Sequence, residues 1–290
     1  MFFDIHAHVY KYQYPAAEGV TLFISPDELV ETHDKLGIDR AVLLPLVSPE
    51  VYVPQSVGEV IDIANESNGR FIPFCNVDPR ALTNTTDAPL GLLLEHYKKL
   101  GCKGLGEVLP NMSWENPYMQ NLLKHTQAIG FPLLFDMNAS TDTGYGIYDD
   151  PGMPMLEKCL AKFPDLIFIG HGPAFWAEIS ELRDPADRHT YPKYPVFKEG
   201  RVAKLMRLYP NLWLDLSAGS GGNALMRDKD YAVSLLNEFC DRTMFGTDIC
   251  HYGQEFTTGD FLIGLKNDNL ISEETFKKIA FKNAYRLLDL

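Results

Sequence analysis

Short apolar runs alternate with amphipathic stretches along the chain, a pattern that predicts buried parallel strands, each followed by a helix. Runs such as "DRAVLLPL" and "LIFIGHGP" have the length of strands. The stretch "SPDELVETHDKLG" offers Ser25 as a helix cap, proline in the first turn and Gly37 at the end, so it predicts a helix. Strands are expected at 2–10, 39–46, 70–79, 102–110, 131–138, 166–173, 212–219 and 242–249.

About eight strand–helix units are the number that a (β/α)8 barrel, or TIM barrel, requires. The alternative is an open doubly wound sheet, whose nucleotide-binding fingerprint would follow the first strand. Here the glycine-rich "GSGG" comes only at 219–222. No linker rich in Pro, Gly or Ser divides the sequence. The chain is therefore predicted to form one α/β domain over residues 1–290, a (β/α)8 TIM barrel.

Composition narrows the classes of function. A hydrophobic content of 46% suits a folded domain with a large core, and the formal net charge of -13 disfavours binding to nucleic acid or to an anionic membrane. The five cysteines form no CxxC pair and no apolar run reaches the length of a membrane span, which points to a cytoplasmic protein with reduced thiols. A small-molecule substrate is the expected partner, and the sequence leaves homo-oligomerisation open.

The opening stretch "FFDIHAHVY" combines an apolar strand with residues typical of a metal site. In a regular strand successive side chains alternate, so Asp4, His6 and His8 are expected on one face and the apolar residues between them on the other. His6 and His8, two residues apart, can then bind one ion. His33 falls in a predicted helix and is expected to face outward.

Polar residues also end most of the other predicted strands: Glu107, Asp136, His171, Asp215 and Asp248. A parallel barrel brings all C-terminal strand ends to one rim, so these side chains should converge there. Each alone has an ordinary structural explanation, such as a helix cap for Asp248 or a hydrogen-bonded turn residue for His171. Burying several unpaired carboxylates and imidazoles together is costly, and a divalent cation would compensate them. The set therefore predicts a metal site.

Three motifs at these strand ends resemble one known family. "DIHAH" on the first strand, "IGHG" on the sixth and "FGTD" on the eighth are similar to motifs of the metal-dependent amidohydrolase superfamily. The nearest part is its amidohydrolase-related branch, which includes aminocarboxymuconate semialdehyde decarboxylase. The resemblance implies a (β/α)8 fold and one or two divalent ions with His6 and His8 as ligands. It also implies Asp248 as ligand and proton acceptor, and His171 as a second-ion ligand or a general acid or base.

The sequence departs from the family at the end of the fifth strand, where Asp136 stands in the place of a histidine. Either the aspartate replaces the imidazole as a ligand or the second ion site is weakened. Glu107 resembles the carboxylate that bridges two ions in binuclear relatives, with a salt-bridged structural role as the alternative. Zinc is the expected metal, although manganese, iron, cobalt and nickel also bind such donors.

The resemblance and the ligand set together predict a metal-dependent hydrolase. A divalent ion lowers the pKa of bound water from 15.7 toward about 7. Asp248 can then accept the proton of that water while His171 stabilises the oxyanion or acts as the acid. The expected reaction cleaves a C–N or C–O bond at a carbonyl in an amide, cyclic amide or lactone. The alternatives are a metal-dependent decarboxylase of a carboxylated aromatic acid and a catalytically silent barrel that binds a metabolite.

Polar residues in the loops after the strands predict a small polar substrate. The basic residues among them favour a substrate that is anionic. Arg80 follows the third strand, and "SAGSGGNALMR" after the seventh strand supplies Ser217, Asn223 and Arg227. Its glycine-rich backbone would hold a carboxylate or phosphate, with a plain turn before a helix as the alternative. Trp176 on the long loop after the sixth strand is expected to contribute to a lid or aromatic wall, with packing at the surface as the alternative.

Overall fold

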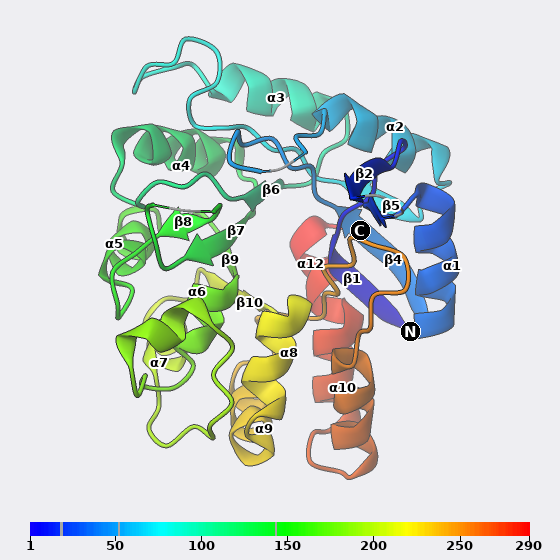
Figure 1. Ribbon diagram of the computed structural model, residues 1–290, viewed down its shortest axis with the longest axis vertical. Coiled ribbons are helices and arrows are strands. Elements are labelled where there is room, and N and C mark those ends of the chain that lie inside the picture. Colours follow the sequence, from blue (N-terminus) through cyan, green and yellow to red (C-terminus); the bar gives the residue numbers. More distant parts are fainter. Residues whose placement is uncertain (18–19, 52, 143) are drawn as a thin grey trace.

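The computed structural model describes residues 1–17, 20–51, 53–142 and 144–290, and it forms a barrel of parallel strands surrounded by helices (Figure 1). Neighbouring barrel strands pair in parallel. Single bridges join Cys75 to Leu105 and Ala7 to Ile249, and they close the barrel at its two seams. The predicted (β/α)8 fold is confirmed. The barrel strands are β1 (Phe2–Ala7), β4 (Ile38–Leu43), β5 (Phe71–Pro73), β6 (Leu105–Val108), β7 (Leu133–Asn138), β9 (Phe168–His171), β10 (Leu212–Asp215) and β11 (Thr243–Met244).

Helices cover the outside of the barrel. Between the barrel strands lie α1 (Pro26–Leu36), α2 (Val57–Glu66), α3 (Gly91–Lys99), α4 (Pro117–Ile129), α5 (Pro154–Lys162), α7 (Arg201–Leu208), α8 (Ala218–Met226) and α9 (Lys229–Glu238). The chain ends with α10 (Thr258–Asn267), α11 (Glu273–Lys277), a π-helical turn at Lys278–Lys282 and α12 (Asn283–Leu288). No helix in the described ranges has both the length and the apolar character needed to cross a bilayer.

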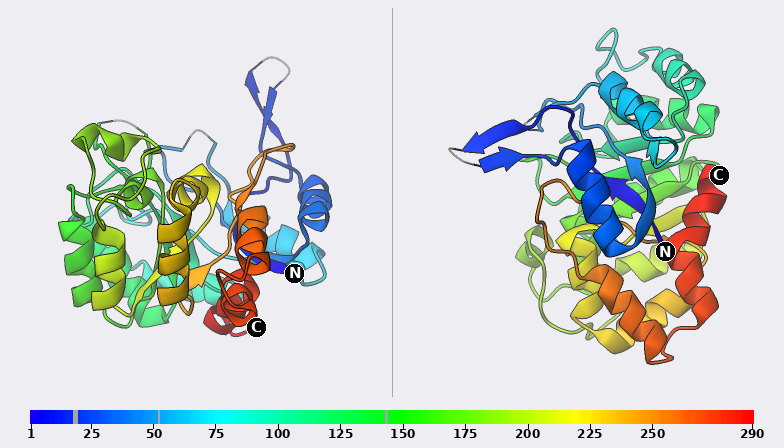
Figure 2. Two further views of the ribbon diagram at one scale, coloured as in Figure 1. Left: turned by 90° about the horizontal axis from the view of Figure 1, so that it is seen from below. Right: turned by 90° about the vertical axis from the view of Figure 1, so that its right-hand side faces the viewer.

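The loops that follow the barrel strands contain smaller elements. They are the antiparallel hairpin of β2 (Tyr14–Ala17) and β3 (Val20–Leu22), the short strand β8 (Ile147–Tyr148), α6 (Pro173–Ala177) and a 3-10 turn at Pro185–His189. The hairpin projects from one end of the barrel, and the C-terminal helices lie at the other end (Figure 2). The end with the hairpin is the rim at which the barrel strands finish.

Local signals set the helix ends as the sequence predicts. Ser25 caps α1 through a capping box with Glu28, and Gly37 ends it in the left-handed conformation with φ 68°. Residues 219–222, for which the sequence predicts an anion cradle or a turn before a helix, lie within the first turns of α8. Small residues suit that position: a Cβ on Gly221 would lie 2.6 Å from the carbonyl oxygen of Leu216.

Between Asp4 and Ala7, β1 contains one extra residue relative to its neighbour β4. The register pairs Asp4 with Ala41 and Ala7 with Leu43, so β1 has two residues between the paired positions where β4 has one. This is the geometry of a β-bulge, which changes the direction of the side chains that follow it. The strict alternation expected from the sequence is therefore interrupted in the middle of the "DIHAH" motif.

The bulge decides which residues of β1 reach the inside of the barrel. Ile5 packs in the interior, and His6, the next residue, also points inward, where it contacts Asp215 of β10. Asp4 instead faces α1, with its Oδ2 atom 3.2 Å from Nε2 of His33. His33 is fully buried, so the expectation that it faces outward is wrong. The expectation that Asp4 shares one face of the strand with His6 and His8 is also wrong, because the bulge changes the direction of the side chains that follow Asp4.

Apolar side chains fill the barrel below the rim. Ala284 and Leu288 of α12 pack in one apolar cluster with residues of the barrel strands, so the last helix closes the end of the barrel opposite the hairpin (Figure 2). This packed base leaves the polar strand ends at the open rim. The strand residues of the cluster are Phe3, Ile5, Val42, Leu44, Ile72, Phe74, Leu134, Ile169, Trp213 and Met244.

Candidate metal centre

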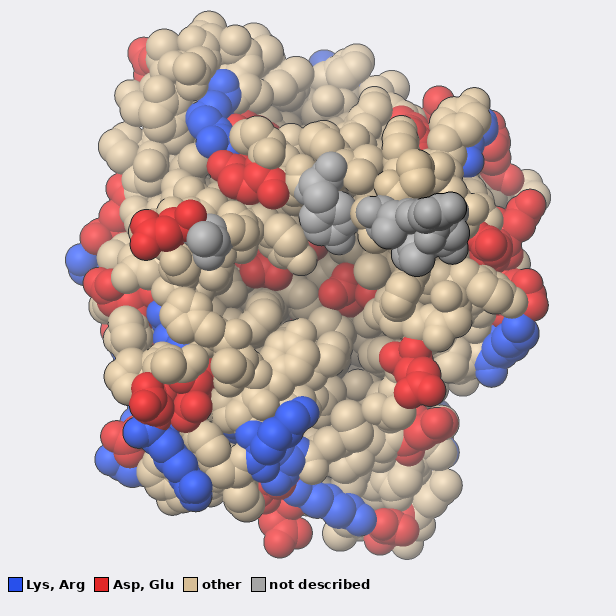
Figure 3. Space-filling model, in the orientation of Figure 1, with Lys and Arg blue, Asp and Glu red and all other residues tan. Residues whose placement is uncertain are grey.

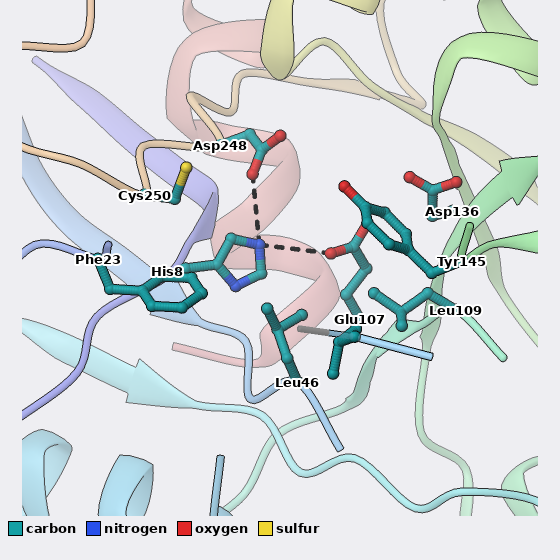
Figure 4. Close-up of a pocket in the computed structure, with 10 residues that line it drawn as sticks. His8, Phe23, Leu46, Glu107, Leu109, Asp136, Tyr145, Asp248 and Cys250 are labelled. Atoms are coloured by element: carbon teal, nitrogen blue, oxygen red, sulfur yellow. Dashed lines mark ion pairs between the residues drawn. The ribbon is translucent and has the colours of Figure 1, made fainter. Parts of the chain in front are cut away.

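Two imidazoles and two carboxylates converge at the rim. Nε2 of His6 lies 3.0 Å from Nε2 of His8, and the Oδ1 atom of Asp248 lies 3.4 Å from the first and 3.3 Å from the second. The Oε2 atom of Glu107 adds a fourth donor, 3.6 Å from Nε2 of His6 and 3.3 Å from Nε2 of His8. Figure 4 shows Asp248 and Glu107 approaching the ring of His8 from two sides.

These spacings fit one tetrahedral ion. Nitrogen and oxygen ligands about 2.0–2.1 Å from a zinc ion lie about 3.3 Å apart along the edges of the tetrahedron. Five of the six separations among the four donor atoms, at 3.0 to 3.6 Å, bracket that value. Neutral imidazoles and carboxylates are also the donor types that zinc and similar divalent metals accept. The residues present are therefore able to hold the metal that the resemblance implies.

Hydrogen bonds on the far side of each ring fix which nitrogen faces this centre. Nδ1 of His8 lies 2.8 Å from the carbonyl oxygen of Leu44, which can only accept, so Nδ1 carries the proton and Nε2 is a free donor for a metal. Nδ1 of His6 lies 2.7 Å from Oδ2 of Asp215 and is protonated for the same reason. When the rings are neutral, both thus present the lone pair of Nε2 to the centre.

Asp215 holds a second imidazole as well. Its Oδ2 atom lies 3.2 Å from Nδ1 of His171 and accepts a hydrogen bond from the hydroxyl of Ser217 at 2.6 Å. The Ser217 oxygen is 2.9 Å from Nδ1 of His171, so carboxylate and hydroxyl orient that ring together. Burial raises the pKa of the Asp215 carboxyl, but the charges and hydrogen bonds of His6 and His171 outweigh it and lower that pKa. The sequence predicts Asp215 at the end of a strand, but it does not predict that this carboxylate orients the two imidazole rings.

A glycine of the "FGTD" motif makes room for this carboxylate. A Cβ on Gly246 would lie 2.5 Å from Oδ1 of Asp215, closer than real Cβ contacts come. Glycine is therefore needed where the chain after β11 passes Asp215. The motif thus serves the orientation of the rings as well as supplying Asp248.

The direction of Asp248 depends on Asp4. The carboxylate of Asp4 accepts hydrogen bonds from the backbone N–H of Thr247, at 2.9 Å, and from its hydroxyl. Asp248 itself has φ 55°, and its N–H donates to the carbonyl oxygen of His6 at 2.7 Å. Asp4 therefore ties β1 to the segment that carries Asp248, a positioning role that the sequence alone did not show.

A second group of donors lies beside the first. Glu107, Asp136 and His171 each offer a ligand atom within 4.8 Å of the others. Glu107 joins the two groups, because its carboxylate also approaches His6 and His8. Nε2 of His171 lies 3.8 Å from Oε1 of Glu107 and 3.9 Å from Oδ2 of Asp248. The structure thus brings together all six residues that the sequence predicts as metal ligands: His6, His8, Glu107, Asp136, His171 and Asp248.

The acid–base properties of the centre reflect dense negative charge. Burial lowers the pKa of His8, but hydrogen bonds to Asp248 and Glu107 raise it overall to about 9. Burial and the charge of Glu107 raise the pKa of Asp136 to about 7. Burial also lowers the pKa of His6, while the charges of Asp248, Glu107 and Asp215 raise it well above its ordinary value. The carboxylates therefore favour positive charge at the imidazoles, which a divalent cation supplies when the rings are neutral.

A pocket with a cavity volume of about 70 Å³ opens from this centre to solvent. Polar groups of the centre form its floor, and Figure 4 shows the aromatic and aliphatic side chains that surround them. The lining residues are His8, Phe23, Leu46, Val51, Glu107, Leu109, Asp136, Tyr145, Asp248 and Cys250.

The five residues predicted to bind substrate are not among those that line this pocket. The Trp176 side chain is buried and donates from Nε1 to the carbonyl oxygen of Asp215 at 3.1 Å, so it lies in the core, which neither the expected wall nor packing at the surface describes. Ser217 is also buried, among the rings that it orients.

The other three make contacts elsewhere. The Arg80 guanidinium pairs with Glu50 and Asp78. Asn223 and Arg227 on and after α8 both donate to the carbonyl oxygen of Pro192. These three residues follow barrel strands, as predicted, but their side chains contact neighbouring loops and not the pocket.

Comparison with known proteins places the chain in a family. The family model described as Amidohydrolase matches residues 3–290. The chain belongs to the amidohydrolase family. A search of the curated proteins finds no match.

Solved structures of similar fold include both hydrolases and decarboxylases. A probable 2-pyrone-4,6-dicarboxylic acid hydrolase from Acinetobacter baumannii has a TM-score of 0.61 and 14% identity, with coverage of 100% of this chain and 99% of that chain. A 5-carboxyvanillate decarboxylase from Sphingomonas paucimobilis has a TM-score of 0.62 and 14% identity, with the same coverage. A zinc-bound amidohydrolase from Burkholderia multivorans has a TM-score of 0.61, 14% identity and again the same coverage. At these identities the likeness establishes the fold, and the amidohydrolase here is an enzyme of the metal-dependent hydrolase or decarboxylase type.

Proposed function

We propose that this amidohydrolase is a zinc-dependent hydrolase that cleaves a C–N or C–O bond at a carbonyl of a small molecule. The observation that carries the proposal is the convergence of Nε2 of His6, Nε2 of His8 and Oδ1 of Asp248 within 3.4 Å of one another. The zinc-bound relative from Burkholderia multivorans supports the choice of metal. A bound divalent ion would supply Lewis acidity, polarising a carbonyl and making a water molecule acidic near neutral pH.

The residues around the centre would divide the remaining work. Asp248 has a side chain that is 26% exposed, whereas the histidine rings are almost fully buried, so it is the carboxylate that a water in the pocket reaches most readily. Its Oδ2 atom lies 3.9 Å from Nε2 of His171. Asp248 would accept the proton of the attacking water, and His171 would stabilise the developing oxyanion or protonate the leaving group.

Metal content tests the centre directly. Elemental analysis of the purified protein should find one or two ions per chain, with near-zero metal in a variant carrying His6→Ala and His8→Ala. A variant carrying His96→Ala and His125→Ala is the matched control, because His96 is exposed on α3 and His125 lies on α4 outside the barrel. Unchanged metal in the His6/His8 variant would reject the proposed site.

The type of reaction is tested with labelled water. A panel of lactones, amides and carboxylated aromatic acids is incubated with the zinc-loaded protein in 18O-enriched water. Hydrolysis places solvent oxygen in the product, whereas decarboxylation releases carbon dioxide and does not. Carbon dioxide release would favour the alternative that the 5-carboxyvanillate decarboxylase represents. Metal binding without turnover of any member would favour the catalytically silent barrel.

A further inference from the structure

The walls of the pocket are apolar above the metal centre. Phe23, Leu46, Val51 and Leu109 line it, together with Tyr145 at the mouth. Phe23 stacks on Tyr10 with ring centroids 3.9 Å apart, which fixes the aromatic side of the wall. A substrate group in contact with these side chains loses its water, and this favours an aliphatic or aromatic group over a charged one.

The floor of the pocket carries excess negative charge. Glu107, Asp136, Asp215 and Asp248 surround the three imidazoles. Even with Asp136 protonated, the other three carboxylates exceed the charge of one divalent ion. In Figure 3 acidic side chains lie in the hollow at the middle of this face, and Lys and Arg side chains lie away from it. With one ion bound, an anionic substrate would therefore meet repulsion from the floor.

None of the described residues that line the pocket is Lys or Arg. Two arginines on loops that follow barrel strands form ion pairs with acidic side chains, and a third, Arg227, donates to the carbonyl oxygen of Pro192. Arg80 contacts Glu50 at 3.0 Å and Asp78 at 2.7 Å. Arg188 is almost fully buried, and its Nε atom lies 2.6 Å from Glu178. Neither guanidinium is left to bind a substrate carboxylate in the pocket.

We propose that the substrate is an uncharged carbonyl compound with an apolar group, such as a neutral lactone, ester or amide, and not a carboxylate or phosphate. The inference rests on the proposed function, because it concerns what the same site binds. It also replaces the anionic substrate expected from the loop sequences. The named substrates of two structural relatives, a dicarboxylic acid and a carboxyvanillate, carry negative charge. The pocket of this chain is therefore selective for a different class of compound.

The test compares two metal-binding probes that differ in one charge. Benzohydroxamic acid is uncharged before it binds, and 4-carboxybenzohydroxamic acid carries a carboxylate. Their dissociation constants are measured with the cobalt-loaded protein by the change in its visible absorption. We expect the uncharged probe to bind at least tenfold more tightly at low salt, and the gap to narrow as added salt screens the repulsion.

A substitution at the pocket mouth tests whether charge is the cause. Tyr145 is 38% exposed and lines the pocket, so Tyr145→Arg adds a cation without burying it. It should raise the affinity for the carboxylated probe relative to the uncharged one by about tenfold. Tyr12→Arg is the matched control, since Tyr12 is 69% exposed and does not line the pocket. It should leave the ratio of the two affinities unchanged.

The outcomes separate this inference from the function beneath it. Equal or tighter binding of the carboxylated probe to the unmodified protein overturns the inference, while the metal site stands. An unchanged ratio in the Tyr145→Arg variant also overturns it, because the preference would then have another cause. If the protein binds no cobalt, or neither probe changes the cobalt spectrum, the proposed function fails and the inference fails with it.

Discussion

Replacing Asp215 by asparagine should weaken metal binding although the residue is not one of the proposed ligands. The Oδ1 atom of Asp215 accepts a hydrogen bond from the N–H of Ser217 at 3.0 Å, so the oxygen of an asparagine will stay at that position. Its NH2 group then points at Nδ1 of His6 and Nδ1 of His171. A donor there favours the tautomer with the proton on Nε2, which removes the lone pair that faces the metal.

The size of the effect follows from the bond that is lost. Nδ1 of His6 lies 2.7 Å from the Asp215 carboxylate, and hydrogen bonds to a charged group contribute about 1.5–3 kcal/mol. Since about 1.4 kcal/mol corresponds to a factor of ten, zinc affinity should fall by roughly 10–100-fold. The side chain keeps its shape, so the barrel should stay folded.

Competition against a chromophoric zinc chelator measures this change. Asp215→Asn is compared with Asp87→Asn, which makes the same chemical change at an exposed position. Circular dichroism checks that both variants are folded. A zinc affinity within about twofold of the unmodified protein in a folded Asp215→Asn variant would refute the view that this carboxylate sets the ring tautomers.

Two further predictions concern protons and stability. Because the pKa of His8 is raised to about 9 without metal, its ring is protonated below that pH, and zinc must displace the proton. For each proton displaced, zinc affinity should therefore fall about tenfold when the pH is lowered by one unit. Calorimetry measures the proton release, because the heat of zinc binding then differs between buffers of different ionisation enthalpy. Equal heats of binding in these buffers would contradict the prediction. Thr247→Val removes the hydroxyl that donates to buried Asp4 and should lower the free energy of unfolding by about 1–3 kcal/mol. Urea unfolding of the metal-free protein measures it, with Thr257→Val at an exposed site as control, and equal midpoints for both variants would count against the Asp4 contact.

The sequence by itself determined the barrel and the positions of the rim residues. Strand and helix signals such as the capping box at Ser25 and the αL glycine at Gly37 are local, so they can be read without knowing the fold. The ends of parallel strands meet at one rim in any such barrel. That rule was enough to predict that His6, Glu107 and Asp248 come together, as the structure shows.

Only the tertiary structure decided which way several side chains turn. The bulge in β1 is a property of how β1 pairs with β4. It separates Asp4 from His6 and His8, although the sequence of the strand predicts regular alternation. The contact between Asp215 and His6 joins residues 209 positions apart, and neither position alone indicates it. Charge pairing of this kind depends on which groups the fold brings within a few ångströms, and the pattern of residues along the chain does not contain that distance.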